Sequence, residues 1–453
     1  MEIPKLILSD LTTIGKSNMI LSQGQKNALS IMLNGKNIFL TGPAGTGKSE
    51  IISSFVKQRP RNKRVYITST TGISAIKIKG RTIHSFAGIG TGSANVQRLI
   101  TNILKERKLK EKWQAVDVLI IDEISMLSAE LFDKLEEIAR YVRQSTQPFG
   151  GIQIILCGDF LQLPNVEGDF CFLAQSWDSV VGDNIVELTE IMRQDNIQFQ
   201  RCLNAVRLNE IDEDTRLLFE ERVGATLDDS FDDILPTRLF ATNRQVDILN
   251  DEELDKLAED GREFVQYDMK ITPYPNIPTK WLDSTIEQFV KRTIFSTSIQ
   301  LCVGAQVMLL SNLDQDAGLV NGSRGVITGF VEQFPRVKFV NGRELVITDA
   351  TIEHEDNHKP ILRATQIPLK VAYASTIHKS QGSSLDCVEI DLGEIFECGQ
   401  AYVALSRARS LKGLILKSIH FDRIKAHPLA LDYYKRIKRN NEASLSTKNG
   451  VKK

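Results

Sequence analysis

The sequence lacks paired cysteines and long apolar runs, and we expect no targeting segment. Its six cysteines stand singly, with no C-x-x-C pair, which argues against a disulfide framework or a cysteine-based zinc site and indicates reduced thiols. No apolar run approaches ~18 residues, so we expect no membrane-spanning helix. The N-terminal residues carry Glu2, Asp10 and scattered lysines, a composition that fits neither a signal peptide nor an Arg-rich transit peptide. We therefore expect an intracellular, soluble protein, with nothing to distinguish nucleus, cytoplasm or viral factory.

An excess of either charge is also missing, since the formal net charge is -1. A nucleic-acid partner would therefore have to be attracted by a local groove rather than by the whole chain. The length of 453 residues exceeds the ~250–300 at which a single core stops growing. We expect two or more domains.

The most informative stretch is Ile38–Ser49, which reads IFLTGPAGTGKS. An apolar run ends in G-x-x-x-x-G-K-S and a helix-compatible segment follows, which is the strand, loop and helix order of a phosphate-binding P-loop. Because this context is present, a chance match is the weaker interpretation. The residues predicted to bind the phosphates are Gly42, Gly45, Gly47, Lys48 and Ser49, with the Ser49 hydroxyl completing a Mg²⁺ shell.

Two carboxylates follow a buried strand at residues 116–121. In a P-loop enzyme Asp122 would hold Mg²⁺ and Glu123 would polarise the attacking water. A further apolar strand at 151–157 leads into GDFLQLP, where the Gln162 amide could contact the γ-phosphate or that water. The alternation of strands and helices predicts a doubly wound parallel α/β sheet.

Composition changes divide the rest of the chain. Residues 88–112 are predicted to form a small insertion, and we favour a solvated helix face for the charged run 105–112. Proline and glycine punctuation between about 265 and 368 predicts a small antiparallel barrel inserted into a second α/β lobe. The expected divisions are 1–184 (first lobe), 185–266 and 369–434 (two parts of the second lobe), 267–368 (inserted SH3-like domain) and 435–453 (basic tail, expected to be disordered and a candidate nucleic-acid contact).

Two polar clusters suit contact with a phosphate backbone. Thr70, Thr71 and Gly72 follow a strand, and Thr376, His378 and Lys379 follow another; hydroxyls and cations at such positions can contact phosphates without reading sequence.

Other single residues remain open between two readings. The amide of Gln25 could bind adenine or lie on the surface. His84 with Phe86 suits backbone contact plus base stacking, although such a segment is more often a turn with a core phenylalanine. His354 and His358 are better explained as a surface pair than as a metal site.

Taken together, the motifs resemble those of superfamily 1 helicases, specifically the Pif-type branch related to RecD-type enzymes. The matching strings span residues 21 to 412 and include GPAGTGKS, TSTTGISA, GRTIHSF, IIDEISMLSAELFDKLEEIARYVRQ, PFGGIQIILCGDFLQLP, LTEIMRQ, GAQVMLLSNLD, GLVNGSRG, STIHKSQG and YVALSRA. Asn165 stands where the family usually has proline and Ser69 where alanine is common; neither change removes a catalytic group.

The resemblance implies two RecA-like lobes with ATP and Mg²⁺ bound between them, driving 5′-to-3′ translocation on single-stranded DNA and duplex unwinding. It assigns Gln25 to adenine, Gln381 and Gly382 to the nucleotide, Gln162 to the γ-phosphate, and Arg193 and Arg407 to arginine fingers from the second lobe. The implied DNA-binding residues are Thr70, Thr71, Gly72, His84, Phe86, Asn243, Thr376, His378 and Lys379.

The resemblance also implies partners and processes. Single-stranded DNA and single/double-strand junctions are the expected partners, other replication or repair proteins are candidates, and a monomer is expected. DNA repair, replication and recombination are the implied processes. The alternative function is a DNA-stimulated ATPase, translocase or switch module that does not unwind on its own.

Overall fold

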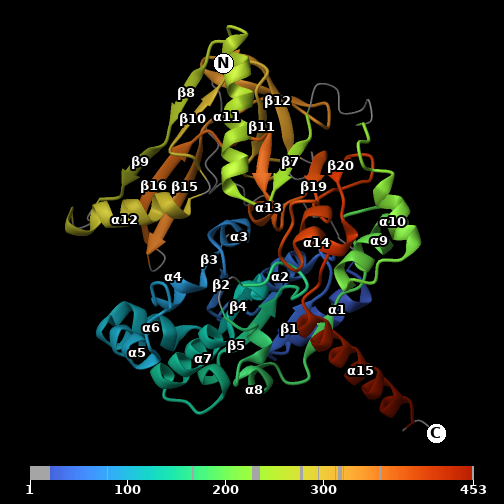
Figure 1. Ribbon diagram of the computed structural model, residues 1–453. Helices are drawn as coiled ribbons and strands as arrows, with labels where there is room; N and C mark the ends of the chain where they lie inside the picture. Colours follow the sequence, from blue (N-terminus) through green and yellow to red (C-terminus); the bar gives the residue numbers. More distant parts are fainter. Residues whose placement is uncertain are drawn as a thin grey trace. The chain divides into compact units, whose positions relative to one another are not determined.

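Figure 1 shows the computed structural model, which describes residues 21–450 except 79, 166–167, 227–234, 276–278, 294, 312, 315–318, 320 and 357–358. The described residues form two compact units. The first, here called the P-loop unit, contains residues 21–218, 395–406 and 420–450. The second unit contains residues 219–394 and 407–419. Residues 1–20, and His358 of the predicted surface pair, lie outside the described residues.

A six-stranded sheet organises the P-loop unit in the order β3-β2-β4-β5-β1-β6. All five pairings are parallel, which confirms the predicted doubly wound arrangement. The strands are β1 (Ile38–Thr41), β2 (Val65–Ser69), β3 (Arg81–Thr82), β4 (Val118–Asp122), β5 (Gln153–Cys157) and β6 (Ile185–Glu187).

Helices cover both faces of this sheet because its central strands are apolar on both sides. Ile38 and Leu40 pack with residues of α1 (Gln23–Leu33) and α2 (Lys48–Gln58). Phe39, between them, faces the opposite layer. The helices that contribute to that layer are α4 (Ile83–Ala87), α5 (Val96–Lys105), α6 (Arg107–Ala115), α7 (Ala129–Arg143), α8 (Trp177–Val181) and α15 (Pro428–Gly450).

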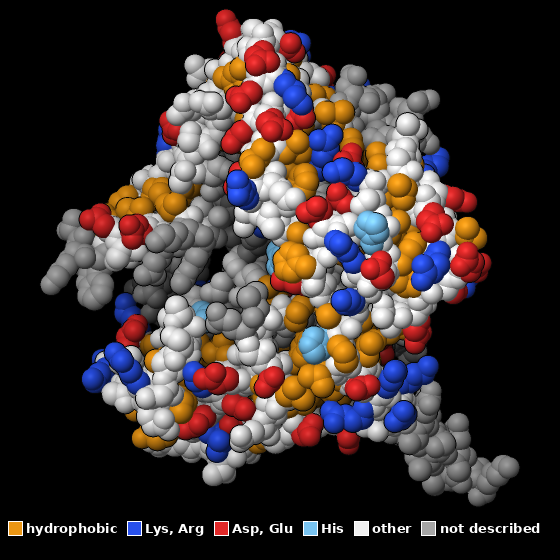
Figure 2. All heavy atoms as spheres, in the orientation of Figure 1, with side chains coloured by type: hydrophobic (Ala, Val, Ile, Leu, Met, Phe, Trp, Pro, Cys, Tyr) orange, Lys and Arg blue, Asp and Glu red, His pale blue; other side chains and the backbone are white. Residues whose placement is uncertain are grey.

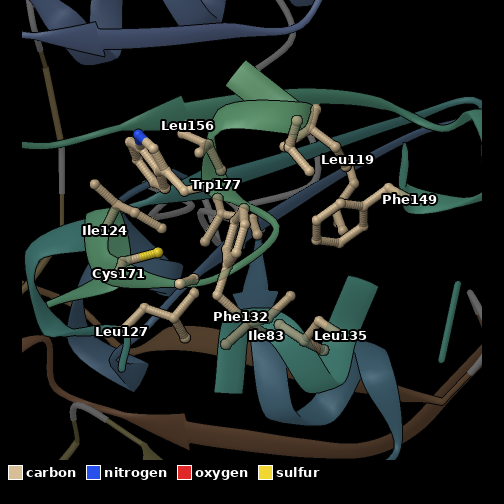
Figure 3. Packing of buried hydrophobic residues seen from close by; sticks show 14 of the residues in the cluster. Ile83, Leu119, Ile124, Leu127, Phe132, Leu135, Phe149, Leu156, Cys171 and Trp177 are labelled. Carbon is tan, nitrogen blue, oxygen red and sulfur yellow. The ribbon is translucent and has the colours of Figure 1, made fainter. Parts of the chain in front are cut away.

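The larger core lies in this second layer. Figure 3 shows Trp177, Phe132 and Leu156 packed closely among its apolar side chains. The rings of Phe132 and Trp177 lie 5.6 Å apart. The remaining elements of the unit are α3 (Gly72–Lys77), η1 (Ile124–Met126), η2 (Pro148–Gly151), η3 (Cys171–Leu173), α9 (Ile197–Leu208), α14 (Gln400–Leu405) and η5 (Phe421–Arg423), while α10 (Glu213–Glu220) crosses the boundary between the units.

The second unit is built on a four-stranded parallel sheet in the order β18-β7-β19-β20. Its strands are β7 (Thr237–Phe240), β18 (Ala374–Thr376), β19 (Val388–Asp391) and β20 (Leu414–Ser418). Two helices, α11 (Asn243–Glu259) and α13 (Ile377–Ser380), contact β18. This parallel sheet confirms the second predicted α/β lobe.

The predicted β-rich insertion is confirmed as three antiparallel sheets in the second unit. The five-stranded sheet contains β14 (Glu344–Val346), β13 (Phe334–Phe339), β12 (Arg324–Val331), β11 (Gln306–Leu309) and β17 (Leu369–Val371). The smaller sheets pair β15 (Ala350–Asp356), β16 (Lys359–Gln366) and β9 (Lys270–Pro273), and β10 (Ser298–Leu301) with β8 (Val265–Asp268). Helix α12 (Thr279–Arg292) lies in the same region of the chain.

Two of the expected divisions differ from the structure. The stretch from Ile185 was expected to start the second lobe, but β6 pairs in parallel with β1 and extends the P-loop sheet. The second part of the second lobe was expected to start at residue 369, but β17 pairs with β11 of the antiparallel sheet and the chain joins the parallel sheet only at β18. A short connection between β17 and β18 therefore links the two sheets.

The C-terminal segment also differs, because residues 435–450 are helical rather than disordered. Ala430, Tyr433, Tyr434 and Ile437 are buried at helical spacing. The basic residues between them are exposed. Because the segment is rich in such residues, its composition suggested a disordered tail rather than an amphipathic helix.

The predicted small insertion folds as α5 and α6. Leu109 and Trp113 of α6 are buried, whereas Arg107, Lys108 and Glu111 are exposed, which agrees with a solvated face for most of the charged run. On the face of the molecule seen in Figure 2, acidic and basic side chains are interspersed. Within the part of the chain that the structure describes, no helix joins enough length to enough apolar character to cross a membrane.

Candidate active site

The loop between β1 and α2 adopts a conformation that its glycines make possible. Gly42, Gly45 and Gly47 have φ of 134°, 81° and 79°, values that other residues rarely adopt. A Cβ at Gly42 would lie 2.3 Å from the Leu188 carbonyl oxygen, and one at Gly45 would lie 2.6 Å from Arg193 Cβ. The segment after β6 therefore packs directly against the loop.

Lys48, the first residue of α2, folds back over this loop. Its Nζ donates to the carbonyl oxygens of Gly42 at 2.6 Å and Pro43 at 2.9 Å. Burial lowers the pKa of Lys48, while the nearby Asp159, Cys157 and Glu123 oppose that shift. The ammonium group thus lies in a partly desolvated site where it would attract a phosphate strongly.

Asp122 ends β4, is buried and interacts electrostatically with Lys48. Burial, with the adjacent charge of Glu123, raises the pKa of Asp122 to about 6. Glu123 follows with φ 54°, a left-handed conformation uncommon for a residue with a side chain. Such strain is frequent at functional sites, and here it turns the chain immediately after the two carboxylates.

The loop after β5 approaches the same end of the sheet. Gln162 is buried, and its backbone N–H donates to the Asp159 carbonyl at 3.0 Å. Gly399, the N-cap of α14, has φ 77° and comes so close that a Cβ would lie 2.5 Å from the Gln162 carbonyl oxygen. Helix α14 thus packs against the loop that carries Gln162.

The two predicted arginine fingers fall in different units. Arg193 lies beside Gly45 in the P-loop unit, not in the second unit as expected, because β6 and the segment after it belong to the P-loop unit. Its Nη1 donates to the Ser406 carbonyl at 3.0 Å. Arg407 belongs to the second unit, where its buried guanidinium donates to the Ser383 carbonyl at 3.1 Å.

Gln25 is buried rather than on the surface. Its Oε1 accepts from Ser22 N in a capping box, and its Nε2 donates to the Thr46 carbonyl at 3.1 Å. A carboxamide has two donors and two acceptor lone pairs, so these bonds leave one of each for another partner.

Among the predicted DNA-binding residues of the P-loop unit, Thr70 is bonded to the backbone of the two carboxylate residues. Its Oγ1 donates to the Glu123 carbonyl at 3.0 Å, and its N–H to the Asp122 carbonyl at 3.3 Å. Thr71 shares a hydrogen bond with Ser74 at 2.8 Å. Gly72 begins α3 and His84 lies half-buried in α4.

The prediction that Phe86 contacts DNA is wrong. It is fully buried and packs between Tyr66 and Trp113, with ring centroids 5.0 and 5.1 Å away. The core alternative is therefore right, because no face of the ring is available to stack on a base.

In the second unit, the predicted residues gather around two strand ends. Asn243 is exposed at the start of α11 after β7, and β7 pairs with β18. Thr376 ends β18 and caps α13 by accepting from Lys379 N at 3.1 Å. His378 is half-buried, Lys379 and Gly382 are exposed, and Gln381 is buried.

No group of three or more His, Cys, Asp or Glu residues within the described ranges is arranged to hold a metal ion. The side chain of His354 and residue His358 lie outside those ranges. A Mg²⁺ ion needs few protein ligands because it retains water and binds substrate phosphates. Ser49 and Asp122 thus remain the candidate ligands.

Sequence reasoning missed three residues of the P-loop unit. Tyr402 of α14 accepts from the P-loop Ala44 N–H at 2.7 Å. Arg207 of α9 pairs with Asp159, and Tyr434 of α15 bonds to both Asp159 and Thr41. Tyr402 lies within the YVALSRA string, but the other two had no motif to mark them.

Comparisons with known proteins match nearly the whole chain. Residues 20–224 match the profile described as PIF1-like helicase, and residues 291–330 match that of the DNA helicase Pif1 2B domain. Uncharacterized protein 030L of invertebrate iridescent virus 6 is 39% identical over 96% of this chain and 97% of its own length. The ATP-dependent DNA helicase PIF1 of Danio rerio is 42% identical over 95% of this chain, which spans only 66% of that protein.

Solved structures agree in fold. The structure of Bacteroides sp Pif1 in complex with ADP-AlF4 has a TM-score of 0.79 and 30% identity, covering 93% of this chain and 98% of that one. The Bacteroides helicase in complex with ADP-AlF3 and single-stranded DNA has a TM-score of 0.63 and 29% identity, over 93% and 98% of the two chains.

Proposed function

Because this chain belongs to the PIF1-like helicase family, we propose that it is an ATP-dependent DNA helicase that moves 5′-to-3′ on single-stranded DNA and unwinds duplex DNA. The observation that carries the proposal is the convergence of Lys48, Asp122 and Gln162 at one end of the P-loop sheet. The names of the chain's relatives support the same activity, as do the complexes of the Bacteroides helicase with nucleotide analogues and single-stranded DNA.

The P-loop residues would bind the phosphates of ATP. Backbone N–H groups of the glycine loop and the start of α2 suit anionic oxygens, and the Lys48 ammonium would exchange its loop carbonyls for the β- and γ-phosphates. Gln25 would contact adenine with its remaining donor and acceptor. Gln381 and Gly382 are proposed as further nucleotide contacts.

The carboxylates suit a divalent cation. Asp122 is buried with its pKa raised to about 6, so a cation would relieve the cost of its charge. Ser49 and Asp122 would hold Mg²⁺, which would neutralise charge developing on the phosphates. Glu123 would orient and deprotonate the attacking water, and Gln162 would hold that water against the γ-phosphate.

Arg193 and Arg407 are proposed as arginine fingers. An arginine finger is worth about 10³–10⁵ in rate, so hydrolysis would depend on both guanidinium groups being in place. Arg193 already lies beside Gly45, whereas Arg407 would leave the carbonyls of Ser380 and Ser383. We propose that movement of the two units during this cycle drives translocation.

Each unit would hold the DNA backbone by its own loop. In the P-loop unit the contacts would come from Thr70, Thr71, Gly72 and His84, and in the second unit from Asn243, Thr376, His378 and Lys379. Thr70 also bonds to the Glu123 carbonyl, so DNA contact at Thr70 could affect the position of the catalytic carboxylate.

Strand displacement on partial duplexes with a 5′ or a 3′ single-stranded tail tests the proposal. We expect release of the labelled strand only with ATP and only from the 5′-tailed duplex, and ATP hydrolysis that rises strongly with single-stranded DNA. Release from the 3′ tail would reverse the polarity. DNA-stimulated hydrolysis without strand release from either duplex would favour a translocase that does not unwind.

A further inference from the structure

The hydroxyl of Tyr434, on the C-terminal helix α15, joins two parts of the candidate active site. It donates to Asp159 Oδ1 at 3.0 Å and accepts from Phe160 N at 3.2 Å. Its remaining lone pair can accept from Thr41 Oγ1 at 2.5 Å. A phenolic hydroxyl has one donor and two acceptor positions, so all three are used.

These partners adjoin groups proposed to act on ATP. Thr41 immediately precedes Gly42, whose carbonyl accepts from Lys48 Nζ at 2.6 Å. The Asp159 carbonyl accepts from Gln162 N at 3.0 Å. The Tyr434 hydroxyl thus links the start of the P-loop to the start of the loop that carries Gln162.

Arg207 fixes the other side of the Asp159 carboxylate. Its Nε and Nη2 donate to the two carboxylate oxygens at 2.9 and 3.0 Å, and both side chains are buried. Burial alone would raise the pKa of Asp159, but Arg207 and Lys48 hold it below the ordinary value. Arg207 also stacks over the Tyr434 ring, 4.9 Å from its centroid.

Packing anchors α15 without the Tyr434 hydroxyl. The adjacent Tyr433 stacks on Phe172 with ring centroids 4.2 Å apart, and its hydroxyl accepts from Trp177 Nε1 at 3.1 Å. Ala430 and Ile437 are buried in the same core. Loss of the Tyr434 hydroxyl should therefore leave the helix in place.

We propose that Tyr434 is a positioning residue for ATP hydrolysis. Through Thr41 and Asp159, its hydroxyl holds the P-loop and Gln162 in fixed register, so that the γ-phosphate and the attacking water are aligned. This inference rests on the proposed function of Lys48 and Gln162. It predicts a loss in the chemical step rather than in nucleotide binding.

The test compares Tyr434→Phe with Tyr433→Phe, which removes a buried hydroxyl from the same helix without touching the P-loop. For Tyr434→Phe we expect kcat of DNA-stimulated ATP hydrolysis to fall about ten- to a hundredfold, with unchanged KM and unchanged affinity for a fluorescent ATP analogue. Tyr433→Phe should retain the wild-type kcat. Melting temperatures of both variants would measure any purely structural effect.

Thr41→Val provides a second variant that keeps the side-chain shape and removes the other hydroxyl. It should reproduce the kcat defect, and the double variant with Tyr434→Phe should be no worse than either alone because both break one link. A wild-type kcat in both Tyr434→Phe and Thr41→Val, or an equal fall of kcat in Tyr433→Phe, would overturn this inference and leave the proposed function intact. Absence of ATP hydrolysis in the unmodified chain would instead overturn the proposed function.

Discussion

Asp122 and Glu123 are adjacent in sequence, but their environments differ. Asp122 is buried at the end of β4, and its Oδ1 accepts from the Glu123 N–H at 2.9 Å. Glu123 lies beyond it in a left-handed conformation and is half-buried. This difference in burial and conformation suits Asp122 for holding a cation and Glu123 for orienting and deprotonating water.

Lys48→Ala should lower kcat for ATP hydrolysis by about 10²–10³ or more, because it removes a cation expected to stabilise the transferred phosphoryl group. Binding of single-stranded DNA should remain measurable. Lys57→Ala on the same helix is the matched control, since Lys57 is exposed. Near-normal hydrolysis by the Lys48 variant would show that the site is misassigned.

Lys370 in β17 is a second residue whose environment shifts its pKa, and this shift makes the stability of the folded chain depend on pH. Burial lowers its pKa from 10.5 to about 8, and the like charges of Lys379 and Arg324 add to that effect. Its ammonium approaches the Ser375 hydroxyl at 3.5 Å. The charged form of Lys370 is therefore disfavoured in the folded chain. Below pH 8 the side chain is charged in both the folded and the unfolded chain, so folding carries the full cost of burying the charge. This cost disappears as the pH rises toward 10.5, the pKa in the unfolded chain.

Lys370→Met should accordingly stabilise the protein at pH 7 by roughly 1–2 kcal/mol, allowing for the partial exposure of this side chain. The gain in melting temperature should shrink between pH 7 and pH 10. Lys256→Met, at an exposed position of α11, should show no such pH dependence. A gain independent of pH would attribute the effect to packing instead of charge.

At the level of elements, α14 is the clearest case of a segment placed by packing. All six of its residues are buried, and its N-cap Gly399 touches the backbone of the Gln162 loop. Residues 395–406 therefore belong to the P-loop unit although they follow the second unit in sequence. The chain returns to the second unit at Arg407, so neighbouring residues of one motif serve different units.

Gly399→Ala should reduce both the melting temperature and ATP hydrolysis, because the added Cβ would lie 2.5 Å from the Gln162 carbonyl oxygen. Gly182→Ala separates the effect of a positive φ from the effect of the close contact made by the added Cβ. Gly182 also has positive φ, at 57°, but a Cβ there has open space. Its substitution should lower stability by about 1 kcal/mol and spare kcat. Equal effects of the two substitutions on kcat would argue against the contact with Gln162.

Across the whole molecule, positive and negative charges are nearly balanced. The net charge is -1, and acidic and basic side chains are interspersed over the visible face (Figure 2). The proposed DNA contacts are mostly hydroxyl, amide and imidazole groups, which hold the backbone without reading bases. Binding should therefore be largely independent of sequence.

The affinity for single-stranded DNA should fall as salt rises, with a log–log slope of about −0.7 per phosphate neutralised. Lys379→Ala should make that slope shallower by roughly 0.7, since Lys379 is an exposed cation in the proposed backbone contact. Lys256→Ala should leave the slope unchanged. Fluorescence anisotropy over a salt series measures both. An unchanged slope in the Lys379 variant would remove this residue from the DNA contact.

The sequence was sufficient for features that depend on local pattern. The P-loop, the two carboxylates at the end of β4 and the alternation of strands and helices follow from residue order and spacing, because backbone conformation and the period of buried residues are local properties of the chain. The helical insertion at α5 and α6 and the β-rich region were predicted for the same reason.

Tertiary structure alone decided which distant segments share a unit. The places of β6 and α14 in the P-loop unit and the link from Tyr434 to Thr41 and Asp159 depend on residues far apart in sequence. Buried hydrogen bonds and apolar packing select such partners by shape and by the cost of leaving polar groups unpaired. No short stretch of sequence contains that information.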